Sequence, residues 1–272
     1  MDVTYAKAAK GLDGAGRWFA KDVAMQGLNR RLRQTICQDK MIDIDFVNCH
    51  PVLLQQIVRD FLRTNCPFLD KYITDRDAML QEMVDAGVSD RGEAKMLVLK
   101  VMNGGSVLDV KTPWWEDLCT EFKDLASKIA THRDHKDFLD HCFAQKGDFN
   151  LHARTMAGVL CHAENQCLEQ LYHLLKGEDC VPHGQCSLIF DCLMIKDSPF
   201  IKAKVSCPVF LEGLTRQIHQ VTGYTMAIKV KEFDEIYELP NNYEDSVSDI
   251  TVIDAGDDLG AADEFLKSSS TD

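Results

Sequence analysis

Residues 90–105 read DRGEAKMLVLKVMNGG, which predicts a helix that ends at a glycine pair. Every fourth residue of this stretch falls on one row: Arg91, Lys95, Leu99 and Asn103. At 3.6 residues per turn, such a row forms a single slowly twisting stripe on the helix surface. Two cations one turn apart suit a helix that binds a polyphosphate. A solvated face with a glycine cap is the commoner meaning of such a pattern, so the stretch by itself leaves both interpretations open.

The composition indicates a globular intracellular protein. The chain has 272 residues, of which 45% are hydrophobic and 27% charged, enough for one large domain or two small ones. No apolar run reaches the roughly 20 residues of a membrane span, and the N-terminus lacks the apolar segment of a secretory signal. The 11 cysteines therefore indicate buried free thiols in a reducing compartment, either cytoplasm or nucleus, and no membrane partner is expected.

Charge is distributed unevenly along the chain. The formal net charge is -13, but residues 233–272 hold twelve acidic side chains and a single basic one, Lys267. Residues 1–40 hold eight bases and four acids, so the body of the chain is near neutral and its N-terminal segment is basic. Such a distribution is compatible with nucleic-acid binding without demanding it.

Alternating and helical patterns predict an α+β fold. Residues 40–47 and 225–233 predict strands, and residues 186–195 predict two strands joined tightly at Asp191-Cys192. Asn48 and Pro51 predict the cap and first turn of a helix that runs to about residue 63. Further helices are expected over about 70–86, 91–103, 115–131, 151–176 and 209–221. Together these elements predict a small antiparallel sheet covered by helices.

Two carboxylates stand where they can face a ligand. Asp45 ends the first long strand, and Asp191 lies at the hairpin. Asp43 and Asp45 point to the same face, so their repulsion would be relieved by a cation, and also by water alone. Taken singly, an Asp in a turn or on the wet face of a strand is ordinary.

The order of these segments resembles motifs A, B and C of the family A DNA polymerases. It comprises an Asp at a strand end, then Arg-x3-Lys-x7-Asn-Gly, then a hairpin Asp. The segment that begins at Gly16-Arg17 and passes through Gln26 and Arg33 is similar to the Gly-Arg segment of that family. The resemblance covers roughly residues 15–232. Single-subunit phage-type RNA polymerases share the same palm and are close competitors.

Three departures from the family motifs leave the choice between DNA and RNA open. The family has a Glu five residues after the motif A Asp, a position held by His50 when counted from Asp45. Counting from Asp45 keeps Pro51 in the first helical turn, which favours this alignment. Motif C, His-Asp-Glu in the family, is Phe190-Asp191-Cys192 here, and Asn103 replaces the Tyr of motif B.

The resemblance implies a compact right-hand polymerase with thumb and exonuclease reduced or absent. Its parts are a basic N-terminal segment (1–40), palm with motif A (41–66), helical fingers with motif B (67–145), palm with motif C (146–240) and a flexible acidic tail (241–272). Two Mg²⁺ ions, for which Mn²⁺ can substitute, would be bridged by Asp45 and Asp191, with Asp43 as a further candidate ligand.

The implied function is template-directed nucleotidyl transfer, with DNA as the product and primer-template nucleic acid and nucleoside triphosphates as partners. Lys95 would contact the phosphates and protonate the leaving pyrophosphate. The implied nucleotide-binding residues are Arg91, Lys95, His50, Leu99, Asn103 and Gly104. The implied nucleic-acid-binding residues are Arg17, Gln26 and Arg30.

Other interpretations stay open at this point. An RNA-synthesising polymerase or primase would use the same palm, and an inactive polymerase-like scaffold would keep the fold alone. Pairs such as His132 with His135, or Cys180, His183 and Cys186, suggest a zinc module, although their spacing fits no common zinc pattern. The acidic tail could recruit replication accessory proteins or have no role.

Overall fold

The computed structural model describes residues 5–7, 12, 15–21, 24–106, 110–182 and 185–238. Residues 1–235 form one compact unit, and a second unit begins at Ile236. The predicted acidic tail, 241–272, lies outside the described residues. In the part described, no helix is both long and apolar enough to cross a membrane. All eleven cysteines are free thiols, and most of them are buried.

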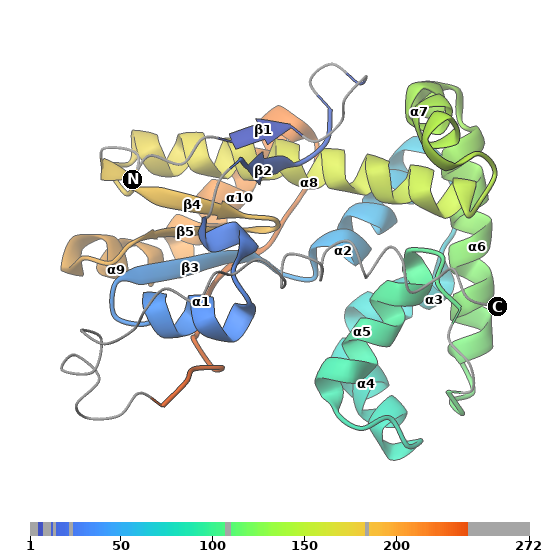
Figure 1. Ribbon diagram of the computed structural model, residues 1–272, viewed down its shortest axis with the longest axis horizontal. Coiled ribbons are helices and arrows are strands. Elements are labelled where there is room, and N and C mark those ends of the chain that lie inside the picture. The colour runs from blue at the N-terminus through green and yellow to red at the C-terminus, as the bar shows by residue number, and fades with distance from the viewer. Residues whose placement is uncertain are drawn as a thin grey trace, which may run out of the picture. The chain divides into compact units, whose positions relative to one another are not determined.

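The centre of the compact unit is a four-stranded antiparallel sheet with the strand order β4-β5-β3-β6 (Figure 1). The strands are β3 (Met41–Phe46), β4 (Cys186–Ile189), β5 (Cys192–Lys196) and β6 (Ile228–Lys231). A separate ribbon pairs β1 (Tyr5–Lys7) with β2 (Trp18–Ala20). The predicted α+β class with a small antiparallel sheet is therefore confirmed.

The helices within the described residues fall into two groups (Figure 1). Those near the sheet are α1 (Arg30–Cys37), α2 (Cys49–Gln56), α8 (Leu151–Gly177), α9 (Pro199–Val205) and α10 (Pro208–Thr222). Those that gather beyond the sheet are α3 (Pro67–Thr74), α4 (Arg76–Asp85), α5 (Arg91–Met102), α6 (Trp115–Thr131) and α7 (Lys136–Lys146). The long α8 contacts both groups, since it packs against α2 and α10 as well as α6 and α7.

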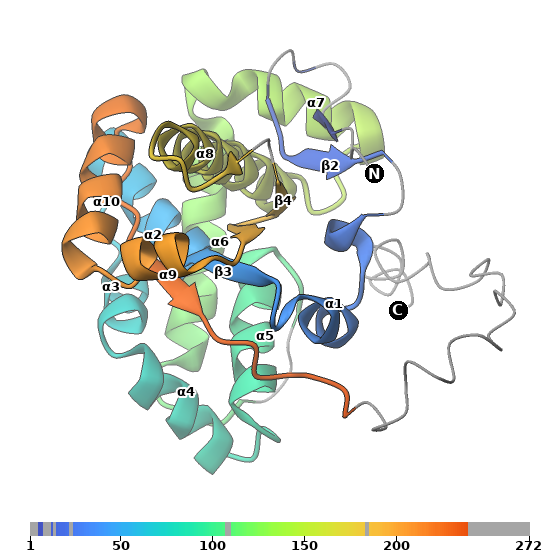
Figure 2. The same cartoon turned by 90° about the vertical axis from the view of Figure 1, so that its left-hand side faces the viewer.

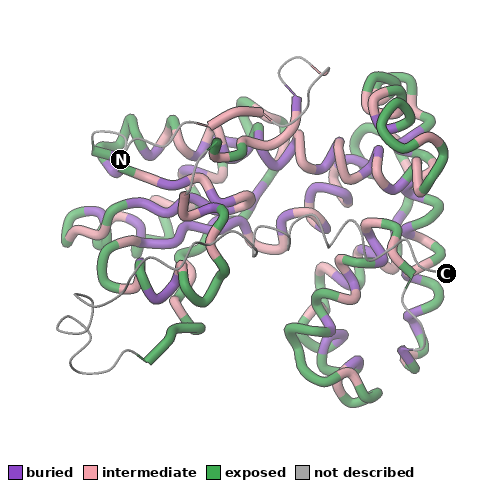
Figure 3. The backbone as a smooth tube through the Cα atoms, in the orientation of Figure 1, coloured by how far each residue is buried: buried purple, intermediate pink, exposed green. Residues whose placement is uncertain are grey.

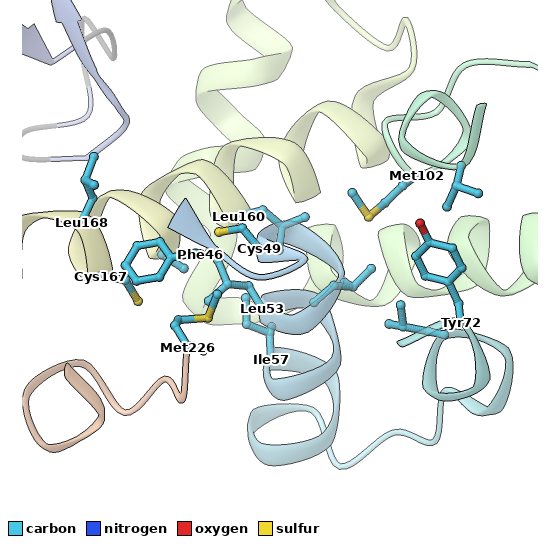
Figure 4. Close-up of a cluster of buried hydrophobic side chains, with 14 of the residues drawn as sticks. Phe46, Cys49, Leu53, Ile57, Tyr72, Met102, Leu160, Cys167, Leu168 and Met226 are labelled. Atoms are coloured by element: carbon cyan, nitrogen blue, oxygen red, sulfur yellow. The ribbon is translucent and has the colours of Figure 1, made fainter. Parts of the chain in front are cut away.

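The two faces of the sheet bury different side chains. Ile42, Ile44 and Phe46 of β3 belong to the main core, which continues into α2 and α8 (Figures 3 and 4). The opposite face, which carries Asp43 and Asp45, is covered in part by a smaller apolar cluster made of Cys37, Ile189, Cys192 and Met194. Figures 1 and 2 agree that α1 and α8 lie on opposite sides of the sheet. The Asp face is thus partly enclosed and is not an ordinary wet face.

One local prediction is wrong, and a second is confirmed only in part. The tight turn is Phe190-Asp191 and not Asp191-Cys192, because Cys192 pairs with Ile189 as the first residue of β5. Phe190 takes the left-handed conformation, with φ 53°, that a two-residue hairpin needs. Asn48 occupies the N-cap position of α2 but is also left-handed, with φ 53°, and makes no capping hydrogen bond through its side chain.

The bounds predicted for the two longest helices, 115–131 and 151–176, agree with α6 and α8. The predicted helix 70–86 is divided at Asp75, whose short polar side chain favours helix ends over interiors. Helices α1, α7 and α9 were not predicted, since they have only 8, 11 and 7 residues and so show little periodicity.

Candidate active site

Backbone pairing brings Asp45 and Asp191 side by side. Asp45 lies opposite Cys192 in the β3–β5 ladder, so Asp191 stands at the next position along the neighbouring strand. The N–H of Phe46 donates to the carbonyl oxygen of Asp191 at 3.2 Å and fixes that position. Two carboxylates that are separated by most of the chain in sequence therefore meet at one end of the sheet.

The electrostatics of this pair favour a cation. Burial, together with the negative charges of Glu164 and Asp45, raises the pKa of Asp191 to about 6. Asp45 contacts the Lys231 ammonium of β6 at 3.5 Å. Since like charges at close range destabilise the ionised state, a divalent cation would relieve the repulsion between Asp45 and Asp191.

Asp43 is 4% exposed, and its Oδ1 has no hydrogen-bond partner among the described residues. Burial raises its pKa, whereas a hydrogen bond from Cys192 and the charge of Lys231 lower it. An orphaned buried carboxylate oxygen beside Asp45 is a donor that a hard cation could use.

The donor set fits magnesium. Carboxylate oxygens are the ligands Mg²⁺ prefers, and it is usually held by one or two of them together with water and substrate phosphates. Within the described ranges, no three His, Cys, Asp or Glu side chains converge on one point. The predicted two-carboxylate arrangement is compatible with that finding. His183 of the alternative zinc interpretation lies outside the described residues.

Helix α5 brings one residue of its row, Lys95, into electrostatic reach of this site. Asp90 caps the helix by accepting a hydrogen bond from the N–H of Glu93 at 2.9 Å. Lys95 is exposed, yet its amine is surrounded by protein atoms, and this desolvation lowers its pKa most. The charges of Arg76 and Lys231 lower that pKa further, whereas Asp191 and Asp45 raise it. Lys95 therefore lies within electrostatic reach of both candidate metal ligands.

The other residues of the α5 row differ in their surroundings. Arg91 is exposed and forms an ion pair with Asp77 of α4. Leu99 is partly buried against the main core. Asn103 ends the helix, and its side-chain amide donates to the carbonyl of Leu99 at 2.9 Å. Gly104 has φ 83°, and a Cβ there would overlap the side chains of Asn150 and Ala153, so the first turn of α8 fills the space beside it.

A buried ion cluster surrounds His50. Glu164 of α8 is 1% exposed, and its Oε2 lies 2.6 Å from Arg17 Nη2 and 2.9 Å from His50 Nε2. Burial lowers the pKa of His50, but hydrogen bonds with Cys161 and Glu164 outweigh it and raise that pKa to about 9. Burial likewise opposes ionisation of Glu164, yet His50 and Arg17 bring its pKa below the ordinary value. Arg17 Nη2 also lies 3.0 Å from His50 Nε2, so the three side chains form one buried hydrogen-bonded cluster.

The predicted nucleic-acid contacts have mixed surroundings. The Arg17 guanidinium lies 5.3 Å above the Phe190 ring and within reach of the Asp191 charge. The Gln26 amide is buried and donates to the carbonyls of Trp18 at 2.8 Å and Leu188 at 3.1 Å, so this conformation gives Gln26 a structural role.

Arg30, the third predicted nucleic-acid contact, lies on the surface of α1. It pairs with Asp234 at 2.8 Å and Glu235 at 3.0 Å, both of which follow β6. The first two acidic residues of the stretch 233–272 therefore pair with the arginine that was predicted to bind nucleic acid.

Sequence reasoning missed three charged residues at this site: Glu164, Lys231 and Arg76. A signal existed for Glu164, since it is the one charged residue among the buried residues of α8. Lys231 and Arg76 gave no such signal, because lysine and arginine are ordinary on an edge strand and in a first helical turn.

Comparisons with known proteins agree with the fold. No family model matches the chain. The "Putative helicase V13" of Sputnik virophage is 24% identical over 255 residues, which are 89% of this chain and 32% of that protein. The chain therefore spans about a third of its relative's length.

Among solved structures, the POL domain of Pol1 from M. smegmatis, in complex with DNA primer-template and dNTP, is similar with a TM-score of 0.52. The two share 10% identity over 86% of this chain and 48% of the other. The fold is thus polymerase-like, with a small antiparallel sheet and many helices.

Proposed function

We propose that this chain is a template-directed nucleotidyltransferase, a DNA polymerase that extends a primer with a compact, divergent family A catalytic core. The observation that supports it best is the meeting of Asp45 and Asp191 at one end of the sheet, with Lys95 in electrostatic reach of both. The polymerase-like fold of the M. smegmatis structure supports the same proposal.

Each residue has a role that its surroundings allow. Asp45 and Asp191 would hold two Mg²⁺ ions. Bound there, the two ions would lower the pKa of the primer hydroxyl and neutralise charge on the triphosphate. Lys95 would contact the phosphates and donate a proton to the departing pyrophosphate, which its lowered pKa favours. Arg91 would bind the terminal phosphates after leaving Asp77.

The residues proposed to contact nucleic acid are assigned from their positions relative to Asp191 and α1. Arg17 and Phe190 lie at the hairpin that carries Asp191, where a primer terminus must approach if the metals are there. Arg30 adds a cation on α1 for the phosphate backbone. The similarity to the "Putative helicase V13" favours replication as the setting, and we propose accessory proteins of replication as partners.

Primer extension tests this function. The full chain is incubated with a labelled primer on a template, with Mg²⁺ or Mn²⁺, and with dNTPs and NTPs in separate reactions. We expect template-matched extension with dNTPs. Extension with NTPs alone would instead assign an RNA product. A folded chain that extends no primer with any substrate or metal would contradict the proposal and favour a polymerase-like scaffold.

A further inference from the structure

Lys231 of β6 is the unexpected neighbour of the carboxylate pair. Its ammonium lies 3.5 Å from Asp45 Oδ2, and in the ladder it stands directly opposite Asp43. Both β3 aspartates therefore have a lysine of the edge strand on their own face, since Lys229 stands opposite Asp45. Of these two lysines, Lys231 makes the ion pair with Asp45.

This ion pair differs from an ordinary surface salt bridge. The Asp45 side chain is 11% exposed and that of Lys231 31%, so water screens the pair only in part. Lys231 also lies within electrostatic reach of Lys95 of α5, whose pKa its charge lowers, as the charge of Arg76 of α4 does. Asp45 and Asp191 act on the same Lys95 amine in the opposite direction, so Lys95 and Lys231 are both close to the carboxylates.

We propose that Lys231 is a nucleotide-binding residue that Asp45 holds in place until substrate arrives. A divalent cation and an ammonium compete for the same Asp45 oxygen, and the cation carries the greater charge. Once displaced, the Lys231 ammonium has a like-charged neighbour, Lys95, so a triphosphate that binds both amines would be its partner. This inference rests on the proposed function. It predicts that loss of the Lys231 charge strengthens metal binding and weakens nucleotide binding.

Two binding measurements test it without turnover. In the first, Mn²⁺ binding to the full chain without nucleotide is followed by electron paramagnetic resonance of the free ion. Lys231→Gln removes the competitor, so it should bind Mn²⁺ about two- to fivefold more tightly than the wild type. In the second, dATP binding is measured by calorimetry with Ca²⁺ in place of Mg²⁺. The same variant should bind dATP about tenfold more weakly.

Lys229→Gln is the matched control, because it removes one positive charge from the same face of the same strand but no ion pair with Asp45. It should change both affinities less than Lys231→Gln does. Lys231→Met, which keeps the apolar stem, carries the same expectations should the Gln variant fold poorly.

A merely structural ion pair would lower the thermal midpoint of Lys231→Gln and leave both affinities as in the wild type, and that result would overturn the inference. Unchanged dATP binding alone would overturn it as well. Both measurements are independent of primer extension. A wild type that binds Mn²⁺ and dATP but extends no primer would contradict the proposed function. The two binding measurements on the Lys231 variant would still support or refute the role of Lys231 in that case.

Discussion

His50 Nε2 lies 2.9 Å from Oε2 of Glu164, and the Arg17 guanidinium contacts the same oxygen. Two side chains from different segments thus share one buried carboxylate oxygen. The second oxygen, Oε1, has no hydrogen-bond partner among the described residues. The carboxylate that joins His50 to Arg17 comes from α8.

This relationship predicts a titration that can be measured directly. The His50 pKa of about 9 depends mainly on Cys161 and Glu164, so Glu164→Gln should lower it, because burial is then opposed by Cys161 without the Glu164 charge. Nuclear magnetic resonance of the imidazole follows the change. Glu169→Gln, on the same helix, should leave the His50 pKa in place. A His50 that titrates near 9 in the Glu164→Gln variant would contradict the assignment.

The same cluster predicts how stability depends on pH. Because the folded-state pKa of His50 lies above its ordinary value of 6.5, its stabilisation is complete below about pH 6.5 and is lost as pH rises through about 9. We expect the free energy of unfolding to fall by roughly 1–3 kcal/mol over that range. His50→Asn should remove most of this slope in urea unfolding series at pH 6 and pH 9.5.

The carboxylate pair predicts loss of activity without loss of fold. Asp45→Asn and Asp191→Asn keep the side-chain shape but remove the charge, so each should reduce nucleotide incorporation at least about a hundredfold. Asp60→Asn, at an exposed position on the turn that follows α2, serves as the control. Near wild-type incorporation by either active-site variant would refute the two-carboxylate assignment.

Substitution of Asp191 is predicted to increase the stability of the fold. Its folded-state pKa of about 6 lies above the ordinary 3.8, so stability is lost as pH rises from about 4 to 6, where the folded state must ionise a buried group. At pH 8, Asp191→Asn should therefore unfold at a higher urea concentration than the wild type. Incorporation by the wild type should rise through about pH 6, as Asp191 becomes an anion able to bind a cation.

The two cations of the α5 row, Lys95 and Arg91, are predicted to affect different kinetic constants. Lys95→Met should lower the rate of incorporation about 10²- to 10⁴-fold, as expected for loss of a general acid. Arg91→Gln should mainly raise the KM for the nucleotide, because Arg91 is proposed to bind phosphates without transferring a proton. Lys100→Gln, which is exposed on the same helix, is the control for a lost charge. Equal effects of Lys95→Met and Lys100→Gln would exclude the proposed role of Lys95.

The ion pairs of Arg30 predict a change in nucleic-acid affinity. Arg30→Gln should weaken primer-template binding and reduce its salt slope by about one. Asp234→Asn combined with Glu235→Gln should strengthen binding, since it frees Arg30 and removes two repelling charges. Fluorescence anisotropy at several salt concentrations measures both. The thermal midpoint should hardly move, because exposed ion pairs contribute little.

Replacement of Gly104 is predicted to lower the stability of the fold. Its φ of 83° and the closeness of Asn150 and Ala153 leave no room for a methyl group, so Gly104→Ala should destabilise the fold by about 1–3 kcal/mol. Gly177→Ala, where an added Cβ meets nothing within 4 Å, is the control. Thermal unfolding of the two variants compares them.

Much of the local structure followed from the sequence because it is coded locally. The period of the α5 and α8 segments and the alternation in β3 predicted those elements. The turn at Phe190-Asp191 did not follow, because its register depends on Cys192 facing both Ile189 and Asp45, a pairing across distant segments. The burial of Asp43 depends in the same way on the apolar cluster that covers its face.

By itself, the sequence determined the chemical types that are present: the two separated aspartates, the cationic row of α5 and their order along the chain. Only the tertiary structure decided which groups meet. Antiparallel pairing of β3 with β5 brings Asp191 beside Asp45, and pairing with β6 adds Lys231. The packing of α8 supplies Glu164 to His50 and Arg17. Contacts between distant segments depend on register and on helix packing, which no local pattern of residues specifies.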